Sequence, residues 1–392
     1  MDQLNLIIEG IHYASRRVVR IGIRNGFIYS LGDIDDIYWT DEGRREQLPL
    51  IAPGLIDLQL NGFMGVDFND PELGGAQVEA ILPLLLRLGV TMFYPALVTG
   101  PKKKTFRLLQ TLGELIEGGG PVSRMIGGIH LEGPFISGED GPRGAHMKRY
   151  CLEPDIGLLH RWQEQAQGHI RIVTLAPELP GSGEFIRECV RMGIRAAIGH
   201  TAASREDIER AAEAGATLST HLGNGAHPLL PRHPNYIWDQ LAEDRLYASM
   251  IADGFHLPDS VLKVFVRTKG EKAILVSDAM PFAGQEPGLY ESPATGKVRL
   301  TKEGRLHREG NPGLLAGSAA TLLEGVGRMS RMEGLTFAWN MASLHPASLI
   351  DLPLRYGLHV GMPADLVLLQ PGTGTPVIRK TYKNGVEVTG GA

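Results

Sequence analysis

The sequence predicts a (β/α)8 barrel of the TIM type together with a small β-sandwich built from both ends of the chain. Eight short apolar runs alternate with helix-like segments between residues 50 and 278 of the 392-residue chain. Such βα repeats are typical of a closed parallel barrel, in which reactive side chains gather at the C-terminal strand ends. Both chain ends carry short strand-like runs that are too small to bury a core alone. We therefore expect a barrel over 50–354 and a sandwich from 1–49 and 355–392.

The strands of the two chain ends follow from alternating or continuous apolar residues and from turn signals. Asn25-Gly26 and Asn384-Gly385 are the residue pairs that two-residue hairpin turns prefer. The candidate strands are 6–10, 17–21 and 27–31 near the N-terminus, and 364–369 and 377–382 near the C-terminus.

The barrel elements follow from the periodicity of apolar residues. The expected strands are 50–60, 90–97, 125–131, 170–176, 194–200, 217–221, 246–252 and 273–278. The expected helices are 77–88, 104–115, 183–192, 205–214 and 259–268, then 321–329 and 335–342 after an inserted loop or hairpin at 281–315. Ser204 and Asp207 have the spacing of a capping box ahead of the helix at 205.

Composition places the chain among ordinary globular proteins. Hydrophobic residues make up 43% and charged residues 21%, and the formal net charge is −5 without a block of like charge. This balance disfavours a nucleic-acid partner, and no apolar run is long enough for a membrane span. The two cysteines, Cys151 and Cys189, form no CxxC motif. We therefore expect a cytoplasmic protein without a nucleic-acid or membrane partner.

Three apolar runs end in residues that can bind a metal ion: Glu132, His200 and His221. Any one of them alone is more often a structural residue. Together, at the C-terminal ends of different strands, they would surround one pocket. A carboxylate and two imidazoles suit Zn²⁺ with an open coordination position, although Fe²⁺ and other divalent ions accept the same ligands. The sequence therefore predicts one divalent metal, zinc first, which would activate water and polarise a carbonyl.

Asp278 ends the eighth apolar run and faces the same expected pocket. A carboxylate there could accept a proton from the attacking water and return it to a leaving nitrogen. The alternative is that Asp278 only caps the following turn. We take Asp278 as the catalytic acid/base.

Seven motifs, in this order along the chain, resemble the N-acetylglucosamine-6-phosphate deacetylase family of the amidohydrolase superfamily. They are Pro53–Gly62, His130–Phe135, Gly199–Thr201, Thr220–Leu222, Ile251–His256, Val276–Met280 and Leu315–Ser318. The resemblance implies the same metal ligands and the same acid/base as the strand ends do. It also implies a homodimer.

The first of these motifs departs from the amidohydrolase superfamily. Its members commonly carry His-x-His at the two positions where this chain has Gln59 and Asn61. Amides are poor zinc ligands, which favours a single metal. We place Gln59 and Asn61 among the substrate contacts.

The resemblance extends to further substrate contacts. His146 corresponds to a histidine near the sugar and its acetyl group, Asn224 to an asparagine that holds the ligand, and His256 to a histidine at the phosphate end. Arg232 would supply the guanidinium that grips the phosphate. Gly225 lies beside the expected ligand and is added to these contacts.

The segment 223–238 also departs from the family. After His221 the family commonly continues Leu-Phe/Tyr-Asn-Ala-Met and then His-Arg-Glu-Pro-Gly, whereas this chain reads LGNGAH and then PRHPNYIW. The expected reaction is the removal of acetate from N-acetylglucosamine 6-phosphate. The alternatives are another acetamido sugar, such as an N-acetylgalactosamine phosphate or an unphosphorylated sugar, another N-acyl compound, or a barrel that serves as a non-catalytic scaffold.

Overall fold

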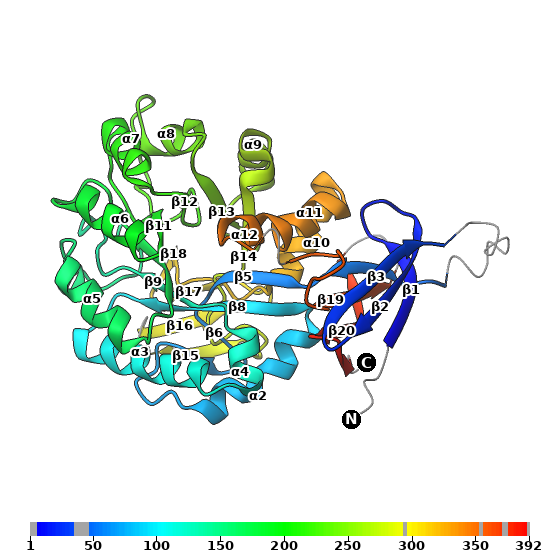
Figure 1. Ribbon diagram of the computed structural model, residues 1–392. Coiled ribbons are helices and arrows are strands. Elements are labelled where there is room, and N and C mark those ends of the chain that lie inside the picture. Colours follow the sequence, from blue (N-terminus) through cyan, green and yellow to red (C-terminus); the bar gives the residue numbers. More distant parts are fainter. Residues whose placement is uncertain (1–5, 35–46, 293–295, 353–355, 371–374, 390–392) are drawn as a thin grey trace. The chain divides into compact units, whose positions relative to one another are not determined.

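The computed structural model describes residues 6–34, 47–292, 296–352, 356–370 and 375–389 (Figure 1). Its contacts divide the chain into two compact units. One contains Met1–Asp57, Leu82–Met92 and Leu322–Ala392, and the other contains Leu58–Ile81 and Phe93–Thr321. The domain limits expected from the sequence, 1–49 with 355–392 and 50–354, stay a prediction. No helix in these parts of the chain is long and apolar enough to cross a membrane.

Both chain ends contribute to one seven-stranded sheet, in the order β21-β20-β19-β4-β1-β2-β3. Asn25 and Gly26, with φ of 55° and 81°, make the predicted tight turn between the antiparallel strands β2 and β3. β19 pairs with β4, which joins the C-terminal strands to the N-terminal ones. The strands are β1 Leu6–His12, β2 Val18–Arg24, β3 Phe27–Asp33, β4 Leu50–Pro53, β19 Leu366–Gln370, β20 Val377–Lys383 and β21 Val386–Thr389.

The predicted barrel is confirmed. Eight strands follow one another in the order β14-β13-β12-β11-β10-β9-β8-β5, and a parallel bridge between Leu60 and Ala279 links the two ends of this order. The strands are β5 Leu55–Leu60, β8 Val90–Val98, β9 Ile129–Glu132, β10 Ile170–Leu175, β11 Arg195–Ile198, β12 Leu218–Ser219, β13 Tyr247–Ile251 and β14 Ala273–Val276, with a short hairpin, β6 Gly62–Phe63 and β7 Val66–Asp67, after β5.

Helices alternate with these strands, and α3, α5, α6 and α7 lie outside them in Figure 1. The predicted capping box starts α7, where the Ser204 hydroxyl accepts from the Asp207 N–H and the Asp207 carboxylate accepts from the Ser204 N–H. The helices are α2 Gly75–Arg87, α3 Lys102–Glu117, α4 Gly120–Met125, α5 Ile156–Gln165, α6 Ser182–Arg191, α7 Arg205–Ala214, α8 Tyr236–Ala242, α9 Asp259–Lys269, α10 Leu322–Glu333, α11 Leu335–Met341 and α12 Leu344–Leu349.

The single strand expected over 50–60 is wrong. The run divides into β4, which joins the sheet of the chain ends, and β5, which joins the barrel. Gly54 separates them, and a Cβ at this position would lie 2.0 Å from the Thr91 hydroxyl oxygen. A side chain at this position would therefore clash with Thr91.

The insertion predicted at 281–315 consists of antiparallel hairpins with a small apolar core of their own. Its strands are β15 Gly288–Ser292, β16 Gly296–Leu300, β17 Leu306–Arg308 and β18 Asn311–Leu315. The core consists of Met280, Phe282, Val298, Leu300, Leu306 and Ala316. Met280 and Ala316 also line the cavity described below, so this core lies beside that cavity.

Candidate metal and substrate site

Four of the predicted residues lie at strand ends, as expected, and three of these have an unusual backbone. Glu132 is the last residue of β9, whereas His200, His221 and Asp278 each lie two residues beyond the end of a strand. These three residues have φ of 51°, 29° and 47°. A left-handed backbone costs a residue with a Cβ about 1 kcal/mol or more, and such strain is concentrated at functional sites. The fold therefore tolerates strain at three positions around one cavity.

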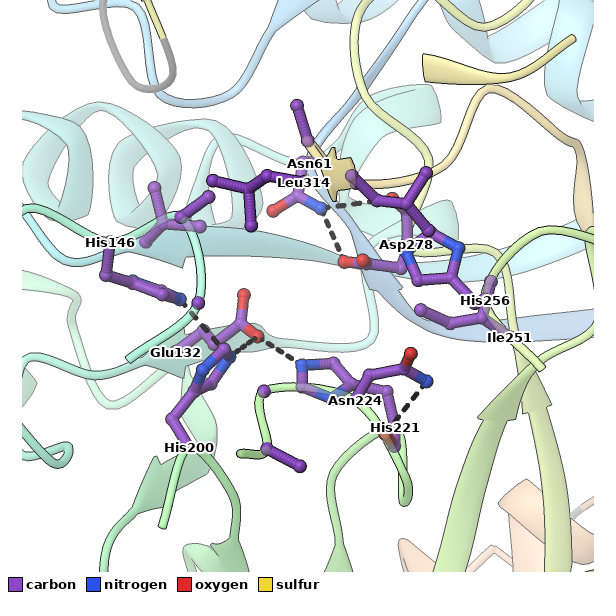
Figure 2. Close-up of a pocket in the computed structure, with 18 of the residues that line it drawn as sticks. Asn61, Glu132, His146, His200, His221, Asn224, Ile251, His256, Asp278 and Leu314 are labelled. Atoms are coloured by element: carbon purple, nitrogen blue, oxygen red, sulfur yellow. Dashed lines mark hydrogen bonds and ion pairs between the residues drawn. The ribbon is translucent and has the colours of Figure 1, made fainter. Parts of the chain in front are cut away.

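Glu132, His200 and His221 form a buried cluster (Figure 2). The Glu132 Oε1 atom lies 3.0 Å from His200 Nε2 and 2.7 Å from His221 Nε2. One possible ligand atom from each of the three residues lies within 4.8 Å of the others. The structure thus brings together the set of metal ligands that the sequence predicted.

The surroundings of His200 support a cation between these side chains. The ring nitrogen Nδ1 of His200 lies 2.8 Å from the carbonyl oxygen of Pro142, which can only accept a hydrogen bond. A neutral His200 therefore carries its proton on Nδ1 and directs the Nε2 lone pair at the Glu132 oxygen. Two facing lone pairs require a proton or a cation between them, and fixing the tautomer in this way is the usual arrangement for metal-binding histidines.

The charge of Glu132 fits the same role. Burial raises the pKa of Glu132, but the adjacent imidazoles of His200 and His221 outweigh burial and hold the pKa well below its ordinary value. The cluster therefore offers one ionised carboxylate and two imidazoles, which are ligands that zinc accepts.

Asp278 lines the same cavity and has a raised pKa. Burial and the neighbouring charge of Glu132 raise the pKa of Asp278 to about 6, against the opposing effects of His221 and His256. Its side chain accepts hydrogen bonds from the amides of Gln59 and Asn61, and from no main-chain N–H of the residues that the structure describes. The alternative role of Asp278 as a turn cap is therefore not supported by its contacts.

His146 approaches the cluster from the loop after β9. Its Nε2 atom lies 3.2 Å from His200 Nε2, and the two rings are nearly perpendicular. Burial and the nearby His200 lower the pKa of His146 to about 3, so this imidazole is neutral at physiological pH. A neutral imidazole can donate one hydrogen bond into the cavity.

The cavity has a volume of about 310 Å³, within the range of small-molecule sites. Nine of the predicted site residues line it: Asn61, Glu132, His146, His200, His221, Asn224, Gly225, His256 and Asp278. Gln59 is buried and contacts Asp278 instead. Arg232 is exposed and does not line the cavity, and the described lining residues include no lysine or arginine. The role of Arg232 stays a prediction.

Sequence reasoning missed Asp253. Its Oδ2 atom lies 2.7 Å from His256 Nδ1, and its other oxygen accepts the N–H groups of Phe255 and His256. Asp253 therefore fixes the His256 ring and leaves Nε2 available to the cavity. The sequence feature that could have indicated this contact is the spacing, with a carboxylate three residues before a histidine.

Gly225 is required for packing against His200. It has φ of 57°, and a Cβ there would lie 2.6 Å from His200 Nδ1. We expect Gly225→Ala to displace the imidazole from Pro142 and to weaken metal affinity about 10- to 100-fold, the usual effect of disturbing the partner of a ligand. The measurement is metal content after dialysis against a graded chelator. Gly193→Ala is the control, because Gly193 also has positive φ but has open space around its Cβ position. Equal metal affinity in both variants would contradict this prediction.

A barrel with these side chains at its strand ends defines a class, the metal-dependent hydrolases. The sequence matches the Amidohydrolase family over residues 50–388, and the chain belongs to this family.

Individual relatives make the likeness more specific. The chain is 35% identical over 358 residues to the N-acetylglucosamine-6-phosphate deacetylase of Bos taurus, covering 88% of this chain and 85% of that protein. It is 30% identical over 328 residues to the N-acetylgalactosamine-6-phosphate deacetylase of Escherichia coli O157:H7, covering 82% and 84%. A mutant N-acetyl-D-glucosamine-6-phosphate deacetylase of Mycobacterium smegmatis, solved in complex with N-acetyl-D-glucosamine-6-phosphate, superposes with a TM-score of 0.85 at 26% identity over 98% of this chain and 99% of that one.

Proposed function

We propose that this chain hydrolyses the acetamide of N-acetylglucosamine 6-phosphate to acetate and glucosamine 6-phosphate. The observation that carries the proposal is the buried Glu132, His200 and His221 cluster in one cavity with Asp278. The relatives that bear this activity in their names support the choice of sugar. In this proposal the cluster holds one divalent metal, zinc first, with iron or another divalent ion as the alternative.

A divalent cation at the cluster would lower the pKa of water and polarise the acetyl carbonyl. Asp278, when ionised, accepts the proton of the attacking water and later gives that proton to the departing sugar nitrogen. His146 donates a hydrogen bond from its neutral ring to the acetyl oxygen as negative charge develops there. Asn61, Asn224 and Gly225 line the space beside the sugar.

The proposed role of Asp278 predicts a pH dependence. Proton acceptance requires the ionised carboxylate, and the pKa of Asp278 is raised to about 6. kcat/KM should therefore fall about tenfold per pH unit below this value and level off above it. A bound cation favours the ionised form and moves the same limb toward lower pH. The pH profile of the metal-loaded enzyme checks this, and a rate that rises on acidification would contradict it.

The phosphate end of the substrate is assigned to His256, supported by Asp253. Asp253→Asn keeps the shape but removes the carboxylate charge that holds His256 Nδ1, so the ring is less firmly oriented and its hydrogen bond to the phosphate weakens. We expect KM for the phosphorylated sugar to rise about tenfold with little change in kcat. KM for unphosphorylated N-acetylglucosamine is the control and should stay unchanged. Equal effects on both sugars would contradict this assignment.

A second sugar remains a candidate because the segment 223–238 departs from the family and one relative is named for N-acetylgalactosamine 6-phosphate. The test compares kcat/KM for N-acetylglucosamine 6-phosphate, its unphosphorylated form and N-acetylgalactosamine 6-phosphate. A preference for the first supports the proposal, and a preference for either of the others redirects it. If the protein turned over none of the three sugars and bound no metal, the result would indicate a non-catalytic scaffold.

A cytoplasmic location and a homodimer stay predictions. The free thiols Cys151 and Cys189 fit a reducing compartment. A homodimer would give Arg232, exposed in this chain, a place against a second copy. Light scattering of the purified protein tests the dimer directly.

A further inference from the structure

Two buried amides converge on one oxygen of the catalytic carboxylate. Gln59 and Asn61 lie two residues apart at the end of β5 and are 1% and 2% exposed. The Gln59 Nε2 atom lies 3.0 Å from Asp278 Oδ1, and the Asn61 Nδ2 atom lies 2.8 Å from the same oxygen. Figure 2 shows the Asn61 amide directed at Asp278. Both side chains therefore donate to the acid/base of the proposed reaction.

The backbone joins the same two segments. The Asp278 N–H donates to the Gln59 carbonyl at 3.0 Å, and the Asn61 N–H donates to the Ala279 carbonyl at 2.9 Å. Asp278 itself has the left-handed φ of 47°. Main-chain hydrogen bonds thus fix where the residue lies, and the two amides fix how its carboxylate is turned.

The two oxygens of Asp278 differ in consequence. Oδ1 accepts both amide N–H groups, whereas none of the hydrogen bonds between described residues reaches Oδ2. Hydrogen bonds to an ionised oxygen are stronger than neutral ones and leave that oxygen a poorer proton acceptor. The oxygen without donors is the one that can take up a proton.

Resting on the proposed function, we propose that Gln59 and Asn61 are positioning residues that hold Asp278 Oδ1 and so reserve Oδ2 for proton transfer. One proton moves from the attacking water to Oδ2 and then from Oδ2 to the leaving sugar nitrogen, so the carboxylate is unchanged at the end of the cycle. Gln59 acts without touching substrate, since it does not line the cavity.

Gln59→Met is the cleanest test, because methionine keeps the length of the side chain and removes both donors. We expect kcat to fall about 10- to 100-fold, the effect of losing one hydrogen bond to a charged group, with KM and metal content unchanged. Asn61→Leu should act in the same direction. Gln163→Met is the matched control, because Gln163 is a buried amide that forms hydrogen bonds with the main chain of Ile170. We expect this variant to have a lower melting temperature and an unchanged kcat.

A double-mutant comparison separates positioning from general damage. In the Asp278→Asn background the carboxylate is gone, so adding Gln59→Met should cost no further rate. A crystal structure of Gln59→Met should show the Asp278 carboxylate rotated or in two orientations while the cluster of Glu132, His200 and His221 is unchanged. An unchanged kcat in Gln59→Met, or a full additional loss in the double variant, would overturn the inference. The crystal structure tests it even for an enzyme that acts on another acyl amide.

Discussion

We expect Asp278→Asn to lower kcat by about 10²- to 10⁴-fold, the usual contribution of a general acid or base, and to leave metal binding intact. Asparagine matches aspartate in shape but cannot accept and return a proton. The metal ligands lie on other strands and do not depend on the Asp278 charge for their geometry. The measurement is steady-state acetate release with metal content determined on the same sample.

The pH dependence of kcat/KM is the control for the Asp278→Asn prediction. With the wild-type carboxylate, whose pKa is raised to about 6, the acid limb of kcat/KM should report the ionisation of Asp278. The limb should disappear in Asp278→Asn, since the titrating group is absent. A variant with a near-normal rate and bound metal would remove Asp278 from the mechanism, and a variant without metal would leave Asp278 a structural role.

We expect Glu132→Gln to abolish metal binding and to reduce turnover to background. The amide keeps the volume of the carboxylate but loses the negative charge that two imidazoles share at 2.7 and 3.0 Å. Because a metal that binds the folded state raises its stability, added zinc should raise the melting temperature of the wild type but not of Glu132→Gln. Thermal denaturation with and without metal measures this difference.

Asp67→Asn is the control for Glu132→Gln. Asp67 is also a buried carboxylate with hydrogen-bond partners, Asn69 and Ser292, but it lies outside the cluster. We expect this variant to lose stability and to retain the response to metal. If Glu132→Gln bound metal with wild-type affinity, the cluster would not be the metal site.

The cluster of Glu132, His200 and His221 was predictable because each of these residues is marked by its own short segment of sequence. Each ligand follows an apolar run, and parallel barrel strands bring their C-terminal ends together. Asp278 followed from the same rule. What the runs do not show is that His200, His221 and Asp278 lie beyond the strands in a left-handed backbone, since this conformation depends on packing around the barrel mouth.

Sequence patterns did not predict the contacts between side chains that are distant in sequence. Gln59 was expected at the substrate, and the structure places its amide on Asp278, 219 residues away. Arg232 was expected at the phosphate, yet within this chain it is exposed. Gly54, where the run 50–60 divides, packs closely against Thr91, which no local pattern connects to it. Sequence patterns indicate which residues share a strand end, whereas tertiary packing decides which atoms meet.

The central claim is that one metal at Glu132, His200 and His221 supports hydrolysis of an acetylated amino sugar phosphate. Titration of the metal-free enzyme with zinc, following acetate release from N-acetylglucosamine 6-phosphate, tests it most directly. We expect activity to rise linearly and to level off at one equivalent of metal per chain. Full activity without metal, or a rise that continues to two equivalents, would contradict it.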